Sequence, residues 1–217
     1  SGFAGHTINK YYAGNALAQL PFFLAAHALA PITGHDADGF SKPYAVATNL
    51  AAIAWVLLGL YCLAALLTAW GVSDRWRAFT LLCFAFGTNL FYYTVVAPGM
   101  SHAYSFGACT ALFLLAWRWE QHARGRELVL MGALLGLIVL IRPVNALVLL
   151  ALPCLWSDPP GTVRKALKAL PALLGAVVLA VAIPALQLLY YKLATGHWLV
   201  YSYGEEGFRW SDPQLLM

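Results

Sequence analysis

The most unusual chemical group in this sequence is a guanidinium inside an apolar stretch. Arg142 is followed by Pro143 in the segment GLIVLIRPVNALVLLALP, which runs from Gly136 to Pro153. An arginine at the centre of a bilayer costs about 2.5–3.5 kcal/mol on insertion scales, and a guanidinium removed from water needs a partner. We therefore expect Arg142 to lie away from the bilayer centre. We also expect it to meet an anion, which is either a ligand or an Asp or Glu of the chain.

Other groups with useful chemistry lie in the segments that the topology derived below places outside the membrane. Cations can neutralise a phosphate, carboxylates can take protons from hydroxyls, and aromatic rings can stack on sugar faces. Such a mixture suits chemistry on a polar group carried by a lipid, although each residue taken singly is better explained as an ordinary polar loop residue. The set comprises His6, His27, His35, His102, His197, Asp36, Asp38, Glu205, Glu206, Asp212, Lys10, Lys42, Lys192 and Arg209.

Metal-binding patterns are weak in this chain. Glu205 and Glu206 could form an acid pair, or a metal site together with a histidine, but adjacent loop acids are usually solvated. The sequence contains no His-x-x-x-His or Cys-x-x-Cys spacing of the kind that binds zinc. No cofactor is therefore predicted, and a divalent metal is left open.

Composition indicates an integral membrane protein. The chain is 61% hydrophobic and only 10% charged, its mean hydropathy is +0.70, and soluble domains carry about 25% charged residues. The net charge of +4 is spread over several loops, so it does not indicate nucleic-acid binding.

Several apolar stretches have the roughly 20 residues that a membrane-crossing helix needs. The clear ones are 44–70, 78–96, 103–119 and 170–191. Residues 128–156 are too long for a single upright crossing. Residues 12–30 are interrupted by polar residues and a proline, which favours an amphipathic helix on the outer face over a crossing helix.

The basic residues predict how these stretches cross. Eight of the 13 lie in three short loops, around 70–77, 118–127 and 157–169, and such loops face the cytoplasm. The last two loops can share a side only if 128–156 crosses an even number of times. We therefore predict a hairpin of two short helices broken at Arg142-Pro143, because proline lacks an N–H and clashes with the preceding turn. Arg142 then lies at or just inside the outer surface.

The predicted fold is accordingly all-α: a polytopic transmembrane helix bundle with a broken-helix hairpin and an outer-face juxtamembrane helix. Residues 1–217 form one transmembrane domain, with an outer segment at 1–43 and an outer loop at 192–217. Small residues predict close helix packing. They are Gly132 and Gly136, and Ala103, Gly107 and Ala111.

Four short segments resemble a known family. INKYYAGNALAQLPFFLAAHALA (8–30) resembles the Lys-Tyr-Pro-Pro-Gly segment that follows the first outer loop of polytopic GT-C glycosyltransferases, the enzymes related to protein O-mannosyltransferases and aminoarabinose transferases. FGTNLFYYTVVAPGMSHAYSF (86–106), IRPVNALVLL (141–150) and YGEEGF (203–208) are similar to further landmarks of a bacterial branch. The likeness covers nearly the whole chain and rests on the order of these short motifs together with the topology.

The resemblance implies transfer of a sugar from a polyprenyl-phosphate donor to a lipid, glycan or protein acceptor, on the outer face of the bacterial cytoplasmic membrane. In that family, basic residues near the membrane hold the donor phosphate, a role that Lys10 and Arg142 match best. The substrate-binding residues that the resemblance implies are Lys10, Tyr11, His102, Arg142, Asn145, Glu205 and Glu206.

The chain departs from the family pattern in two places. Tyr12-Ala13 stands where the family has Pro-Pro, and the first helix and the catalytic acid of the first outer loop are expected upstream of Ser1. We therefore expect a fragment that is inactive alone, with Asp36 and Asp38 as weak substitutes for the acid. The alternatives are a transporter, whose broken helices also bring charge near the membrane interior, and a non-catalytic binder of lipid-linked intermediates.

Overall fold

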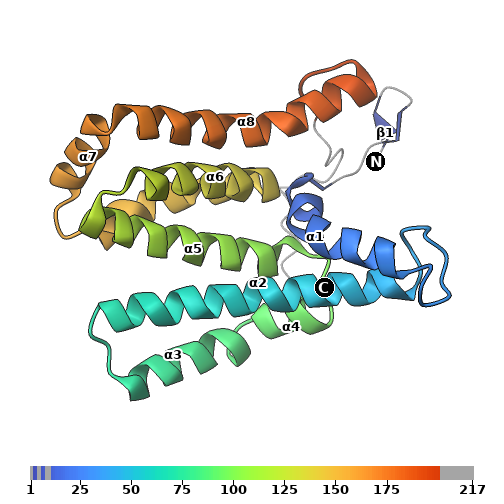
Figure 1. Ribbon diagram of the computed structural model, residues 1–217, viewed down its shortest axis with the longest axis horizontal. Helices are drawn as coiled ribbons and strands as arrows, with labels where there is room; N and C mark the ends of the chain where they lie inside the picture. Colours follow the sequence, from blue (N-terminus) through green and yellow to red (C-terminus); the bar gives the residue numbers. More distant parts are fainter. Residues whose placement is uncertain (1, 4–5, 8–10, 201–217) are drawn as a thin grey trace, which may run out of the picture. The chain divides into compact units, whose positions relative to one another are not determined.

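The computed structural model describes residues 2–3, 6–7 and 11–200, and it falls into two compact units. One unit comprises residues 13–184, and the other comprises residues 1–12 together with 185–217. Each unit is considered by itself. The described chain is predominantly α-helical (Figure 1), which confirms the predicted fold class at that level.

The smaller unit contains the end of the last helix and two short strands. Strands β1 (Gly2–Phe3) and β2 (His6–Thr7) pair antiparallel. Helix α8 (Leu170–Thr195) passes from one unit to the other after Pro184, a residue that removes one backbone donor from the helix. It ends four residues beyond the predicted 170–191, and the Lys192 ammonium donates to the Gly196 carbonyl just after that end.

Two helices in the described chain are long and apolar enough to span a membrane. They are α2 (Lys42–Ala69), which coincides with the predicted 44–70, and α8. The apolar element η1 (Pro143–Leu155) and helix α7 (Pro159–Lys168) qualify as a third span only if taken together, and they are bent by 109°. Membrane association follows from these helices.

The predicted crossing at 78–96 is not one helix. It comprises α3 (Asp74–Phe86) and the short helix α4 (Leu90–Val95), which are separated at residues 87–89. Thr88 explains the break, because its hydroxyl donates to the Phe84 carbonyl and accepts from the Leu90 N–H. The side chain therefore ends one helix and starts the next, and the neighbouring Gly87 has low helix propensity.

The central helices pack through small residues, as predicted. Gly107 of α5 (Ser101–His122) lies against the Trp55 carbonyl of α2, with no space for a Cβ atom. Gly132 of α6 (Gly125–Ile141) meets the Ala176 backbone in the same way, and Gly136 approaches the Leu179 carbonyl. These contacts bring the helix backbones together, as in membrane bundles.

The long apolar run turns back at Arg142, where the hairpin was predicted. Helix α6 ends at Ile141, and the returning arm η1 is a 3₁₀-helix rather than the expected α-helix. Pro153 opposes an α-helical arm, because its ring would clash with the carbonyl four residues earlier. The tighter winding also matches the arms in length: 17 residues of α-helix rise about 25 Å, and 13 residues of 3₁₀-helix rise about 26 Å.

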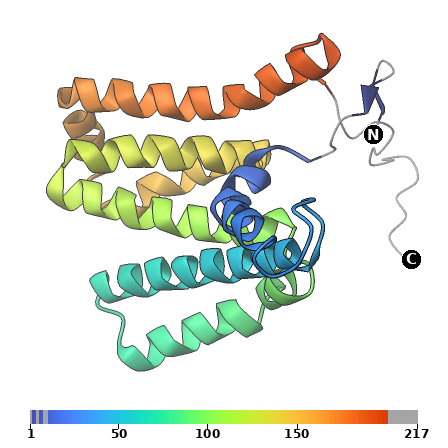
Figure 2. The ribbon, with the colours of Figure 1, turned by 45° about the vertical axis from the view of Figure 1, so that its right-hand side comes forward.

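The three basic loops lie at the same end of the larger unit. Figures 1 and 2 both show the α2–α3 turn, the α5–α6 turn and α7 together, on the left. Hydrogen bonds join the last two: the Lys165 ammonium donates to the Glu120 carbonyl, and the Asp158 N–H donates to the Glu120 carboxylate. The loops 118–127 and 157–169 therefore lie at the same end of the larger unit, as the charge pattern required.

Candidate anion-binding site

Arg142 occupies the end of α6, at the opposite end of the larger unit from the basic loops. Its backbone is extended, with φ −153° and ψ 119°, and its N–H donates to the Ile138 carbonyl. The negative end of the α6 dipole favours a cation at this position. The side chain is half-buried. Across residues 11–200 the only ion pair joins Arg77 and Asp74, so no carboxylate of the described chain lies within salt-bridge distance of the Arg142 guanidinium.

His102 lies beside Arg142, at the start of α5. Its ring stacks on that of Tyr93 from α4, with 3.9 Å between the ring centroids and 23° between the planes. Burial lowers the pKa of His102 below its usual value of 6.5, and the positive charge of Arg142 lowers it further. The imidazole is outside the predicted crossing 103–119. It is therefore neutral at pH 7 and faces a permanent cation.

Asn145 holds the hairpin turn to α5. Its backbone N–H donates to the Arg142 carbonyl at 2.9 Å, and its side-chain amide donates to the Ser105 hydroxyl at 2.9 Å. The structure thus brings together three residues that the sequence assigned to one site: His102, Arg142 and Asn145.

The start of α1 (Gly14–Leu29) closes one side of this region. Gly14 lies directly on the backbone of Leu140 and Ile141, where a Cβ atom has no space. The Asn15 side-chain NH₂ donates to the Gly99 carbonyl at 3.0 Å, which fixes the orientation of the amide. The Asn15 carbonyl oxygen is buried and has no hydrogen-bond partner in the described chain. It is a buried acceptor that no group of the described chain satisfies.

A residue of α5 also fixes the loop between α4 and α5 by a hydrogen bond. The Tyr104 hydroxyl, which is buried, donates to the Pro98 carbonyl at 2.7 Å. Asn15 binds the next residue, Gly99, from the other side. The segment that carries His102 into position is therefore fixed by two different helices.

The other predicted substrate-binding residues cannot be compared with Arg142 in position. Lys10, Glu205 and Glu206 lie outside the described residues, and Tyr11 belongs to the smaller unit. Their predicted substrate-binding roles stay predictions.

Asp36 and Asp38 lie in the loop between α1 and α2, at the far end of α1 from the hairpin turn (Figure 1). The 16 residues of α1 separate the two ends by about 24 Å. Asp38 accepts hydrogen bonds from the N–H groups of Phe40 and Ser41, both at 2.8 Å, and these bonds lower the pKa of Asp38. Its carboxylate shapes this loop, and neither acid is brought to Arg142.

Three residues of the site were not assigned to it from the sequence. Tyr93 and Ser105 belong to apolar stretches, and Asn15 interrupts another. Their roles depend on which helices meet, and no local spacing carries that information. A polar residue that interrupts an apolar stretch is the one usable signal, and it applies to Asn15.

Within the described residues, no three His, Cys, Asp or Glu side chains are grouped closely enough to hold a metal ion. No protein-family model, curated protein or solved structure matches this chain.

Proposed function

We propose that this chain belongs to a membrane glycosyltransferase of the GT-C type, which moves a sugar from a polyprenyl-phosphate donor to an acceptor outside the bacterial cytoplasmic membrane. One observation carries the proposal. The half-buried guanidinium of Arg142 has no carboxylate partner in the described chain, and it stands beside a histidine that is kept neutral. A half-buried cation without an internal counterion is suited to an anionic ligand.

The orientation follows from charge. The end with the three basic loops faces the cytoplasm under the positive-inside rule. Arg142, His102 and Asn15 then face outward, where a lipid-linked sugar and an acceptor would meet. The hairpin arms of about 25 Å approach the roughly 30 Å of a hydrocarbon core, so a turn at Arg142 lies near the membrane surface.

The chemistry of transfer gives each residue a role. Breaking the bond between an anomeric carbon and a polyprenyl phosphate develops negative charge on the leaving oxygens. A guanidinium can hold two such oxygens at once and stabilise that charge. The neutral His102 ring can form a hydrogen bond with a sugar hydroxyl. The carboxylate that removes the proton of the acceptor is not among the described residues of this site.

A transporter is the second candidate, because the structure contains a second interrupted helix. The break at 87–89 between α3 and α4 accompanies the break at Arg142, and α4 supplies the ring that stacks on His102. Paired interruptions that meet at one site are typical of secondary transporters.

Binding of the donor lipid tests the first proposal. Purified protein would be titrated with a polyprenyl-phosphate hexose, with the neutral polyprenol as control, and its thermal unfolding followed. Ligand at about 100 times its Kd adds roughly 2.7 kcal/mol of stability. We expect stabilisation by the phosphate lipid alone, its loss in Arg142→Ala, and its retention in Arg77→Ala.

Two results would overturn the proposal: equal stabilisation of the parent protein and Arg142→Ala, or no response of a folded parent protein to the phosphate lipid. Uptake of a solute into proteoliposomes that contain no lipid-linked sugar would favour the transporter instead.

A further inference from the structure

Helix α7 turns across the end of the larger unit that carries the basic loops. It is bent by 109° from η1, so it runs nearly perpendicular to the hairpin arm that precedes it. Figure 1 shows α7 crossing the direction that α5 and α6 share. Because the hairpin arms run through the membrane in the proposed orientation, α7 lies nearly parallel to the membrane surface.

Local contacts hold α7 in this position. The Asp158 carboxylate accepts from the Gly161 N–H at 3.0 Å and caps the helix. Pro159 occupies the first helical position, where a proline is favourable. Thr162 is buried, and Ala166 packs against the core of the larger unit. One face of a well-capped helix is therefore fixed against the bundle.

The outward side of α7 divides into an apolar strip and a basic strip. Val163 and Leu167 are 50% and 62% exposed, and their spacing of four residues places them on the same side of the helix. Arg164 and Lys168 are exposed at the same spacing, and each directly follows one of these apolar residues. Successive residues of an α-helix are rotated by about 100°, so the two strips are adjacent. Adjacent apolar and basic strips are typical of a helix that lies in a membrane interface.

The charge at this end of the larger unit is positive. Asp74 pairs with Arg77, Glu120 and Glu127 are buried, and the carboxylate of Asp158 caps α7. Within residues 11–200, no carboxylate lies within salt-bridge distance of the exposed basic residues of this end. Those residues are Arg75, Arg118, Arg124, Arg126, Arg164, Lys165 and Lys168.

The depth of α7 agrees with the position proposed for Arg142. The η1 arm rises about 26 Å, and a hydrocarbon core is roughly 30 Å thick. With Arg142 near the outer surface, α7 lies at the inner boundary of the core. Trp70 and Trp76, at the neighbouring α2–α3 turn, are 48% and 63% exposed, and exposed tryptophans are typical of a membrane interface.

An anionic phospholipid surface matches all of these features. The helix is parallel to it, the apolar strip can enter the acyl region, and the basic strip can meet the phosphates. A soluble polyanion would contact the basic strip alone and would leave Val163 and Leu167 in water.

We propose that α7 lies in the headgroup layer of the cytoplasmic leaflet, where Val163 and Leu167 enter the bilayer and Arg164 and Lys168 bind the phosphates of anionic phospholipids. The inference uses the orientation given by the basic loops, and it does not depend on the glycosyltransferase activity.

Lipid titration of the purified, detergent-solubilised protein tests the basic strip, with native mass spectrometry measuring the Kd of each lipid. Phosphatidylglycerol is compared with phosphatidylcholine of the same chains, and the parent protein should prefer phosphatidylglycerol. A basic residue near an anionic surface contributes about 1 kcal/mol. Arg164→Gln and Lys168→Gln should therefore each weaken phosphatidylglycerol binding about fivefold and leave phosphatidylcholine binding unchanged. Lys42→Gln, which removes one charge at the opposite end of α2, should change neither.

Spin labels test the apolar strip. Val163→Cys, Arg164→Cys, Leu167→Cys and Lys168→Cys each carry a nitroxide, in a protein whose four native cysteines are replaced by alanine. The protein is reconstituted in bilayers that contain phosphatidylglycerol. Labels at 163 and 167 should be relaxed mainly by oxygen, which enters the bilayer. Labels at 164 and 168 should be relaxed mainly by a water-soluble nickel complex.

Four results would overturn the proposal. They are equal affinity of the parent protein for the two lipids, an effect of Lys42→Gln as large as that of Arg164→Gln, equal access of the nickel complex to all four labels, and tighter binding of an RNA oligonucleotide than of phosphatidylglycerol. The third would place α7 outside the bilayer, and the fourth would assign the basic strip to a soluble polyanion.

Discussion

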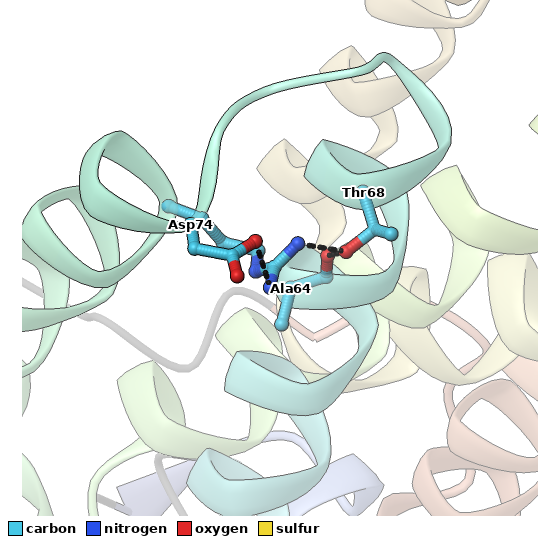
Figure 3. A network of polar contacts seen from close by, with 4 residues as sticks. Ala64, Thr68 and Asp74 are labelled. Carbon is cyan, nitrogen blue, oxygen red and sulfur yellow. Dashed lines mark hydrogen bonds and ion pairs between the residues drawn. The ribbon is translucent and has the colours of Figure 1, made fainter.

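Two turns of this protein carry an arginine in opposite circumstances. At the α2–α3 turn, Arg77 donates to the Asp74 carboxylate and to the Thr68 hydroxyl, at 2.8 Å and 2.7 Å (Figure 3). Thr68 in turn donates to the Ala64 carbonyl, so the whole set is satisfied within two helices. At the α6–η1 turn, Arg142 is half-buried and has no carboxylate within reach in the described chain.

The difference shows which arginine is available for function. Asp74 is almost fully exposed, so its ion pair with Arg77 contributes little to stability and closes a surface turn. Arg142 has given up part of its hydration without gaining a counterion, and an external anion can supply one. Each of the following predictions alters one side of this comparison.

The largest effect is expected when Arg142 is given the local acid that Arg77 already has. Asn145→Asp places a carboxylate three residues from Arg142, the same spacing as that between Asp74 and Arg77. An internal ion pair would then compete with the phosphate. We expect affinity for the polyprenyl-phosphate hexose to fall at least about 30-fold, which corresponds to about 2 kcal/mol.

Asn145→Ala is the control for this variant, because it removes the hydrogen bond to Ser105 without adding charge. The affinities would be measured by lipid titration. Equal affinities of Asn145→Asp and Asn145→Ala would contradict the view that Arg142 binds the phosphate.

The next largest effect is expected when a methyl group is added to Gly14, where α1 contacts the end of α6. In Gly14→Ala the new methyl group would meet the backbone of Ile141, so α1 must shift. Overpacking of this kind costs about 1–3 kcal/mol. The variant should unfold at a lower temperature and should also lose affinity for the phosphate lipid, because Asn15 moves with α1.

Gly71→Ala is the matched change at the other turn. Gly71 has a φ of +73° and open space around it, so alanine there costs about 1 kcal/mol of conformational strain and should leave lipid binding unchanged. Loss of lipid binding in Gly71→Ala would mean that the α2–α3 turn affects the Arg142 site. Retention of lipid binding in Gly14→Ala would mean that α1 does not contribute to that site.

A small effect is expected at the paired arginine. Asp74→Ala removes the ion pair of Arg77, and because the carboxylate is exposed the loss of unfolding free energy should be below about 1 kcal/mol. Thermal unfolding at low and high salt would measure it, and the parent and the variant should converge as salt screens the pair. A loss of several kcal/mol would contradict the view that this exposed ion pair contributes little to stability.

The sequence predicted the parts of this fold that depend on long patterns. Two continuous apolar runs correspond to α2 and α8, and the distribution of basic loops required the turn at Arg142. The break at 87–89 was not predicted, because one threonine hydroxyl with two backbone hydrogen bonds is a local event inside an apolar run. The 3₁₀ winding of η1 was missed for a similar reason, since apolar periodicity does not distinguish it from an α-helix.

The site was predicted unevenly, for physical reasons. Arg142 was evident because a charge in an apolar run is costly wherever it lies. His102 and Asn145 were assigned through the resemblance, and the structure places both beside Arg142. Tyr93 and Asn15 were not assigned, because they reach the site only through the contacts of α4 and α1 with α5 and its preceding loop.

The smallest expected effect is a pH dependence at His102. Burial and then the charge of Arg142 hold the pKa of His102 below 6.5 in the folded protein, whereas the unfolded chain protonates near 6.5. The unfolded state therefore binds more protons as the pH falls through 6.5, so the contribution of His102 to stability is complete above 6.5 and declines below it. His102→Gln should lack this decline in melting temperature.

Arg142→Ala should raise the pKa of His102 toward 6.5, because it removes the charge that helps to lower it. A phosphate lipid that neutralises Arg142 should raise the pKa of His102 in the same way. NMR of the imidazole measures both changes. An unchanged pKa of His102 in Arg142→Ala would mean that burial alone lowers it and that the charge of Arg142 does not act on the imidazole.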